Sequence, residues 1–148
     1  MTAEPEGLTG HVLDLDAVHH VLDAKSDYGR EIVRQSVLRN TTLLLPAVAA
    51  QCLAGLRPQQ AEALLAVPVV TIGGLPAADV LSAAQIGRKM TANLERRAPG
   101  VAAEAEIVAV LAAAHAVVLA EARGGWRIVT STPHLYDDIA GVRLEILP

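Results

Sequence analysis

Phenylalanine is absent from this chain of 148 residues, and the other aromatic residues, one Trp and two Tyr, make up only 2% of it. Hydrophobic residues still account for 52% of the sequence, so the core must be built mainly from Ala, Val and Leu. Small side chains of this kind can pack closely between neighbouring elements. The composition therefore favours tightly packed helices over a large aromatic cage for a cofactor, and we expect no cofactor in the resting protein.

Cysteine and long hydrophobic runs are also scarce. The single cysteine, Cys52, excludes an intrachain disulfide and a thiolate zinc site, and we expect it to be a small buried hydrophobe. The longest apolar stretch, Ile107 to Ala120, contains His115 and is shorter than the roughly 20 residues needed to cross a bilayer. The N-terminus carries two Glu and no apolar run, unlike a signal peptide. We therefore expect a cytoplasmic protein without membrane contact, with one domain over residues 1–148 and a frayed arm at 1–10.

The chain also lacks an excess of positive charge. Its net charge is -4 and its pI is near 5.7, so no global field draws it onto nucleic acid. Any RNA contact must use local basic patches, although such clusters are also typical of solvated helix faces. Two groups qualify: Arg30, Arg34 and Arg39 on one expected helix, and Arg88, Lys89, Arg96 and Arg97 around another.

Apolar segments of strand and helix type alternate along the chain. Strands are predicted at 11–15, 41–45, 68–72, 126–130 and 142–147, and helices at 27–39, 46–53, 59–65, from about 76, and at 101–123. Gly55 is expected to end the helix that begins at Pro46 in a left-handed cap. Alternation of this kind predicts right-handed crossovers and a mainly parallel α/β sheet of four or five strands, covered by helices on both faces.

Polar residues stand where several of these strands end, which is where function gathers in parallel sheets. Asp14 and Asp16 follow the first strand, and Thr130 to Thr132 follow the fourth. The two acids share a face only if the strand continues through Asp16, where they could hold a metal ion. Alternatively, Asp16 caps the next helix.

Four short motifs carry a resemblance to a known family. They are VLDLDAV at 12–18, LLPAVAAQCLAG at 44–55, HAVVLAEA at 115–122 and IVTST at 128–132. In this order and spacing they resemble the PIN domain family, known for metal-dependent ribonucleases that include the toxins of bacterial toxin–antitoxin pairs. The resemblance implies a PIN-like three-layer fold, a homodimer and an antitoxin-like protein partner.

The resemblance also implies a site that has lost most of its acids. It places Asp14 on the first acidic position and Asp16 on a Ser/Asn position, whereas Gln51, His115 and Thr132 stand where the family has Glu, Asp and Asp. Mg²⁺ or Mn²⁺ prefers several anionic oxygen ligands, which Gln51 and Thr132 cannot supply and for which the His115 nitrogen is a poor substitute.

Three readings follow from these residues. In the first, the domain is catalytically degenerate and acts by binding a protein or nucleic-acid partner. In the second, it is an active endoribonuclease of the toxin–antitoxin type that uses Asp14, Asp16 and a further acid with Mg²⁺ or Mn²⁺, and Asp14 is a metal ligand. In the third, the motifs match by chance and the chain is another small α/β domain.

Overall fold

The computed structural model describes residues 9–23, 26–100 and 106–148, so most of the expected arm at 1–10 and the start of the expected helix at 101–123 lie outside it. The strands are β1 Gly10–Leu13, β2 Thr42–Pro46, β3 Val70–Gly73, β4 Arg127–Thr130 and β5 Leu144–Ile146. The helices are α1 Leu15–Leu22, α2 Asp27–Arg39, α3 Ala47–Leu56, α4 Pro58–Leu65, α5 Val80–Arg97 and α6 Ile107–Ala122, with 3-10 turns η1 Ala77–Asp79 and η3 Pro133–Tyr136.

The described strands form one sheet in the order β3-β2-β1-β4-β5, and each neighbouring pair runs parallel. β1 lies at the centre, with His11 opposite Leu43 of β2 and Arg127 of β4. Parallel neighbours require crossover connections, which the intervening helices supply. The predicted mainly parallel α/β sheet is therefore confirmed, with five strands.

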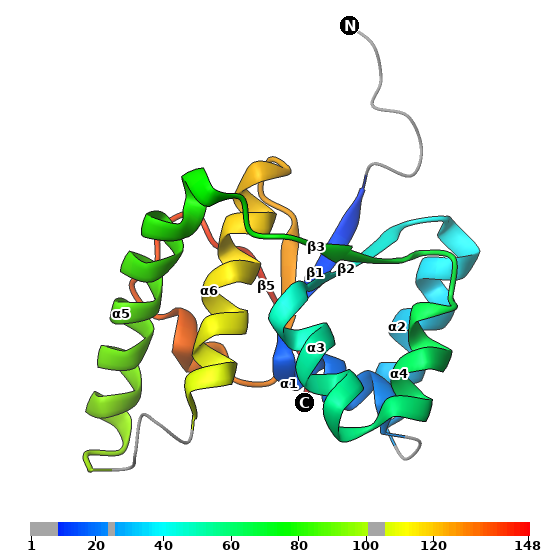
Figure 1. Cartoon of the computed structure of the whole chain (residues 1–148), viewed down its shortest axis with the longest axis horizontal. Coiled ribbons are helices and arrows are strands. Elements are labelled where there is room, and N and C mark those ends of the chain that lie inside the picture. The colour runs from blue at the N-terminus through cyan, green and yellow to red at the C-terminus, as the bar shows by residue number, and fades with distance from the viewer. Residues whose placement is uncertain (1–8, 24–25, 101–105) are drawn as a thin grey trace, which may run out of the picture.

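Alternate residues along the strands belong to two separate apolar clusters, one on each face of the sheet. Leu13, Leu45 and Val129 pack with residues of α1, α3 and α4. Val12 and Ile128, their neighbours in sequence, pack with residues of α5 and α6 on the other face. Figure 1 shows the same division, with α5 and α6 on one side and α1 to α4 on the other. The fold therefore has three layers, as the alternation of strands and helices predicts.

Helix α6 is apolar on all sides and is the most buried helix of the described chain. The buried residues run without a break from Ala112 to Ala120, and His115 is among them. A helix that is apolar all round is suited to a protein core. In the described part of the chain, no helix is both long enough and apolar enough to cross a bilayer.

Several element boundaries differ from the prediction. The first strand ends at Leu13, because Asp14 caps α1 and Leu15 is already helical. Gly10, assigned to the frayed arm, is the first residue of β1. Gly55 does not end its helix, since α3 continues to Leu56 and is capped at Arg57 without left-handed backbone. These differences arise because capping and tertiary packing set element ends more than local sequence does.

Candidate functional site at the carboxyl ends of the strands

Asp14 joins the central strand to the first helix. It accepts a hydrogen bond from the Ala17 backbone N–H through Oδ1 at 3.0 Å, and its backbone is extended, as expected of an N-cap residue. Its side chain is 2% exposed. The capping role that the sequence left open for Asp16 therefore belongs to Asp14.

Tyr136 contacts the other oxygen of the same carboxyl group. Its hydroxyl donates to Asp14 Oδ2 at 2.8 Å, and its ring is almost completely buried. The 3-10 turn η3 positions it directly after β4. Burial, and next the charge of Asp14, raises the pKa of Tyr136 well above its ordinary value, so Tyr136 stays a hydrogen-bond donor.

The environment of Asp14 disfavours its charge. Burial is the largest influence and raises the pKa of Asp14 above its ordinary value of 3.8. Hydrogen bonds from Thr130, Ala17 and Tyr136 oppose this, and the nearby Asp16 raises the pKa further. The carboxyl group is therefore held by donors but is poorly solvated.

Asp16 lies beside this group and is held by the strand end of β4. Thr132 donates its hydroxyl to Asp16 Oδ2 at 2.9 Å, and the Thr132 backbone N–H donates to Thr130 Oγ1 at 3.0 Å. The Thr130 and Thr132 hydroxyl oxygens are 3.3 Å apart. Three residues predicted from the sequence, Asp14, Asp16 and Thr132, thus gather where β1 and β4 end.

Two other predicted positions make their contacts elsewhere. His115 Nε2 lies 3.0 Å from the carbonyl oxygen of Gly74, which follows β3. Because β2 separates β3 from β1, and parallel strands are about 4.8 Å apart, this contact is roughly 10 Å from the central strand. Gln51 is exposed on α3, and no contact described for it involves Asp14. That Gln51 and His115 share a pocket with Asp14 and Thr132 therefore stays a prediction.

Helix α6 presents a different residue to the Asp14 end of the sheet. Ala112, one turn before His115, is fully buried in the cluster that contains Leu13, Ala17 and Ala49. Its methyl group supplies no ligand oxygen. Because α6 is rich in Ala, the motif that aligns this helix with the family can be shifted by one turn without changing its pattern of apolar residues. The sequence alone could therefore not decide whether Ala112 or His115 stands at the family's acidic position.

Sequence reasoning missed two residues that shape the site. The first is Tyr136, whose hydroxyl bonds Asp14. Asn93, on α5, is buried and donates through Nδ2 to the carbonyl oxygens of Leu135 and Asp137, at 3.0 and 2.8 Å. Asn93 therefore holds the backbone on both sides of Tyr136. A polar Asn among the apolar positions of a helix was the available signal.

The described residues do not fit a site for Mg²⁺ or Mn²⁺. Such ions need several converging anionic oxygens. Within residues 9–23, 26–100 and 106–148, no group of three or more His, Cys, Asp or Glu side chains could hold a metal ion. Both Asp14 oxygens already accept hydrogen bonds, and Asp16 accepts one from Thr132.

Comparison with known proteins identifies the fold. The sequence matches no family model and no curated protein. A chain in the crystal structure of VapBC2 from Rickettsia felis bound to a DNA fragment from their promoter matches with a TM-score of 0.59 and 14% identity. A chain of DNA-bound VapBC from Salmonella typhimurium matches with a TM-score of 0.57 and 19% identity. Each match covers 93% of this chain and 98% of the other. At these identities the likeness concerns architecture, and the chain has the PIN-like α/β fold that its motifs predict.

Proposed function

We propose that this chain is a PIN-like domain that does not cleave RNA with a metal ion and acts by binding a partner. The observation that carries the proposal is the state of Asp14. Its carboxyl group is buried and its two oxygens accept from Ala17 N–H and Tyr136 O–H. A carboxyl group used in this way stabilises the junction of β1 and α1. Its oxygens would have to exchange their hydrogen-bond donors for a hard cation before they could act as metal ligands.

The partner we propose is an antitoxin-like protein. The two solved structures compared above are VapBC complexes bound to DNA, and we extend that association to this chain as a proposal, including nucleic-acid contact made through the complex. An open groove of about 420 Å³ between α1, α2 and α4 suits an apolar segment of such a partner. Its lining is largely aliphatic: Val21, Leu22, Val33, Ala63, Leu64 and Val67.

We also propose that the chain forms a homodimer. Large apolar side chains remain exposed in the single chain, among them Leu38 at 67%, Leu56 at 68% and Leu81 at 78%. Such residues can be covered by a second copy. Light scattering at micromolar concentration should give twice the monomer mass, and a monomer mass would contradict this part of the proposal.

A metal-dependent endoribonuclease is the second candidate. It is favoured by one observation, the presence of both Asp14 and Asp16 at the carboxyl end of the central strand in a fold shared with VapBC chains. In this alternative, Mg²⁺ or Mn²⁺ would supply a Lewis acid and an activated water. It requires a further acidic ligand near the two aspartates.

Calorimetry and an RNA assay separate the two candidates. The chain is titrated with MnCl₂ and MgCl₂, then incubated with mixed RNA substrates and each metal. Asp14→Asn is compared with Glu62→Gln, a matched removal of charge on the exposed face of α4. We expect no saturable metal binding and no cleavage by any of the three proteins.

Metal binding together with RNA cleavage that Asp14→Asn abolishes and Glu62→Gln retains would overturn the proposal and establish the nuclease. Cleavage that both variants retain would indicate a contaminating nuclease, since it would not depend on the site. The absence of cleavage with a folded protein supports the binding function.

A further inference from the structure

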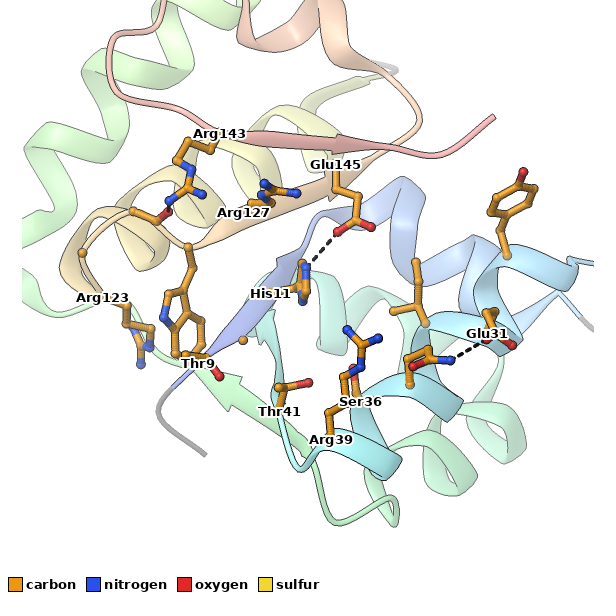
Figure 2. Close-up of a pocket in the computed structure, with 17 residues that line it drawn as sticks. Thr9, His11, Glu31, Ser36, Arg39, Thr41, Arg123, Arg127, Arg143 and Glu145 are labelled. Carbon is orange, nitrogen blue, oxygen red and sulfur yellow. Dashed lines mark hydrogen bonds and ion pairs between the residues drawn. The ribbon is translucent and has the colours of Figure 1, made fainter. Parts of the chain in front are cut away.

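A cavity lies at the amino ends of the strands, on the edge of the sheet opposite Asp14. Its volume is about 750 Å³. Residues at the starts of β1, β4 and β5 form one wall, and one face of α2, from Tyr28 to Arg39, lies opposite them (Figure 2). The cavity shares no residue with the group around Asp14 and does not depend on the function proposed for that group.

Arginine dominates this cavity in a chain that is acidic overall. Arg39, Arg123, Arg127 and Arg143 line it, which is four of the 12 basic residues in a sequence of net charge -4. They come from four different segments: the end of α2, the loop after α6, β4, and the approach to β5. Their convergence is therefore a product of the fold and not of a charge run on one helix.

The two acids in the lining are already paired with other groups. Glu145 Oε2 lies 2.8 Å from His11 Nε2. Glu31 accepts from Arg34 at 2.9 and 2.8 Å, and these bonds lower the pKa of Glu31 to about 2. Because Arg34 is not part of the lining, it offsets the charge of Glu31 from outside. The four arginines therefore leave the cavity with a net positive charge.

The arginines differ in how they are held. Arg123 lies 5.6 Å from the centroid of the Trp126 ring and donates to the Leu119 carbonyl oxygen at 3.1 Å. Arg143 donates to the Gly125 carbonyl oxygen at 3.5 Å. For Arg39 and Arg127, no acidic partner occurs among the described residues. These two guanidinium groups are available for an anion.

The chemistry of the lining favours phosphate. Guanidinium groups donate paired hydrogen bonds whose geometry matches phosphate oxygens, and several together offset more than one negative charge. Tyr28, 60% exposed at the α2 side of the cavity, offers a ring on which a flat base can stack. The volume falls within the range of sites for molecules of nucleotide size.

We propose that this cavity is a nucleotide-binding site, in which Arg39, Arg127 and Arg143 hold the phosphates and Tyr28 contacts the base. RNA carries the same chemical groups, and an acidic peptide carries the same charge. We take the mononucleotide as the occupant, because a cavity of about 750 Å³ that offers both guanidinium groups and an exposed ring matches a small ligand that carries phosphates and a base.

Calorimetry with the full chain tests the site directly. The probes are ATP, sodium triphosphate, adenosine, a uridine dodecamer and a heptaglutamate peptide. We expect ATP to bind, triphosphate to bind more weakly and adenosine to give no signal. Raising the salt concentration should weaken binding, since the contacts are charged and solvent-accessible.

Substitutions locate the binding. Arg39→Ala and Arg127→Ala should each weaken ATP by about tenfold or more, the usual effect of losing a hydrogen bond to a charged group. Tyr28→Ala should weaken ATP and leave triphosphate unchanged. Arg88→Ala, on α5 and outside the cavity, should bind as the parent does. Circular dichroism melts establish that each variant is folded.

Three outcomes would overturn the proposal. ATP and triphosphate could both fail to bind at about 1 mM, where even a weak site would be half-filled. Binding could persist unchanged in Arg39→Ala and Arg127→Ala. The dodecamer or the peptide could bind through these arginines while ATP does not, which would assign the cavity to RNA or to an acidic protein instead.

Discussion

The hydroxyl of Tyr136 donates to Asp14 Oδ2 at 2.8 Å, although 122 residues separate the two along the chain. This bond joins the turn after β4 to the start of α1. It replaces solvent at a buried carboxyl group and leaves Asp14 acting as a structural acceptor.

Removal of this hydroxyl should destabilise the protein. In Tyr136→Phe the ring still fills its place, but Asp14 Oδ2 loses a donor inside the core. We expect the free energy of unfolding to fall by about 1–3 kcal/mol, measured by urea denaturation. Tyr28→Phe removes a hydroxyl from an exposed ring and should change it by less than about 0.5 kcal/mol. Equal changes in the free energy of unfolding for the two variants would show that the bond from Tyr136 to Asp14 does not stabilise the fold.

The raised pKa of Asp14 predicts a pH dependence opposite to that of a salt-bridged carboxylate. The folded state holds the Asp14 proton more tightly than the unfolded state, so this group's contribution is fully present below its ordinary pKa of 3.8 and is lost as pH rises through the folded pKa. Each unit of difference corresponds to about 1.4 kcal/mol. Asp14→Asn has no such proton, so its stability relative to the parent should improve as pH rises from 3.8 toward neutrality. A difference that stays constant across denaturation curves in this range would contradict the raised pKa.

His115 should make the opposite contribution. Burial lowers its pKa below the ordinary value of 6.5, while the bond to Gly74 partly opposes this. The unfolded state then binds the proton more tightly, so stability from this group is present above 6.5 and is lost as pH falls below it. His115→Gln keeps an N–H donor for Gly74 and cannot titrate. Between about pH 7.5 and 5.5 the parent should lose more stability than this variant. A parallel loss in both would show that His115 is not the titrating group.

Two glycines on helices should respond in opposite ways to alanine. A Cβ at Gly29 would lie 2.2 Å from the His20 carbonyl oxygen, so Gly29→Ala must push α1 and α2 apart. We expect it to lower the melting temperature and to cost about 1–3 kcal/mol. A Cβ at Gly55 meets nothing within 4 Å, and Gly55→Ala should stabilise α3 by about 0.5–1 kcal/mol. Thermal melts of both variants decide this, and a loss of stability at Gly55 would mean that its backbone is not helical in solution.

The sequence predicted the sheet well because its strands are short apolar runs whose alternate residues feed two clusters. Val12 and Leu13 illustrate this, since they point to opposite faces and each is fully buried. The sequence indicated helix α1 only through the alternative in which Asp16 caps the next helix, and no bounds were predicted for it. Its start is fixed by the Asp14 cap, a contact between a side chain and the backbone three residues later.

The candidate site was predictable only in its local part. Asp14, Asp16 and Thr132 stand at strand ends, a position that the sequence reveals. Tyr136 and Asn93 act across the fold, and nothing near them in the sequence indicates their partners. The arginine cavity was hidden for the same reason. Of the basic residues predicted on α2, Arg30 and Arg34 pair with Asp27 and Glu31, whereas Arg39 faces the cavity.

Two hydrogen bonds from Asn93 to the backbone around Tyr136 attach the turn that follows β4 to helix α5. Because η3 is only four residues long, it has little internal hydrogen bonding of its own and must open whenever α5 detaches. The amides of η3 should therefore exchange with solvent deuterium at the same rate as those in the second half of α5, forming one unit of local unfolding. Asp14 would then lose its tyrosine partner each time a helix on the far face of the sheet opens.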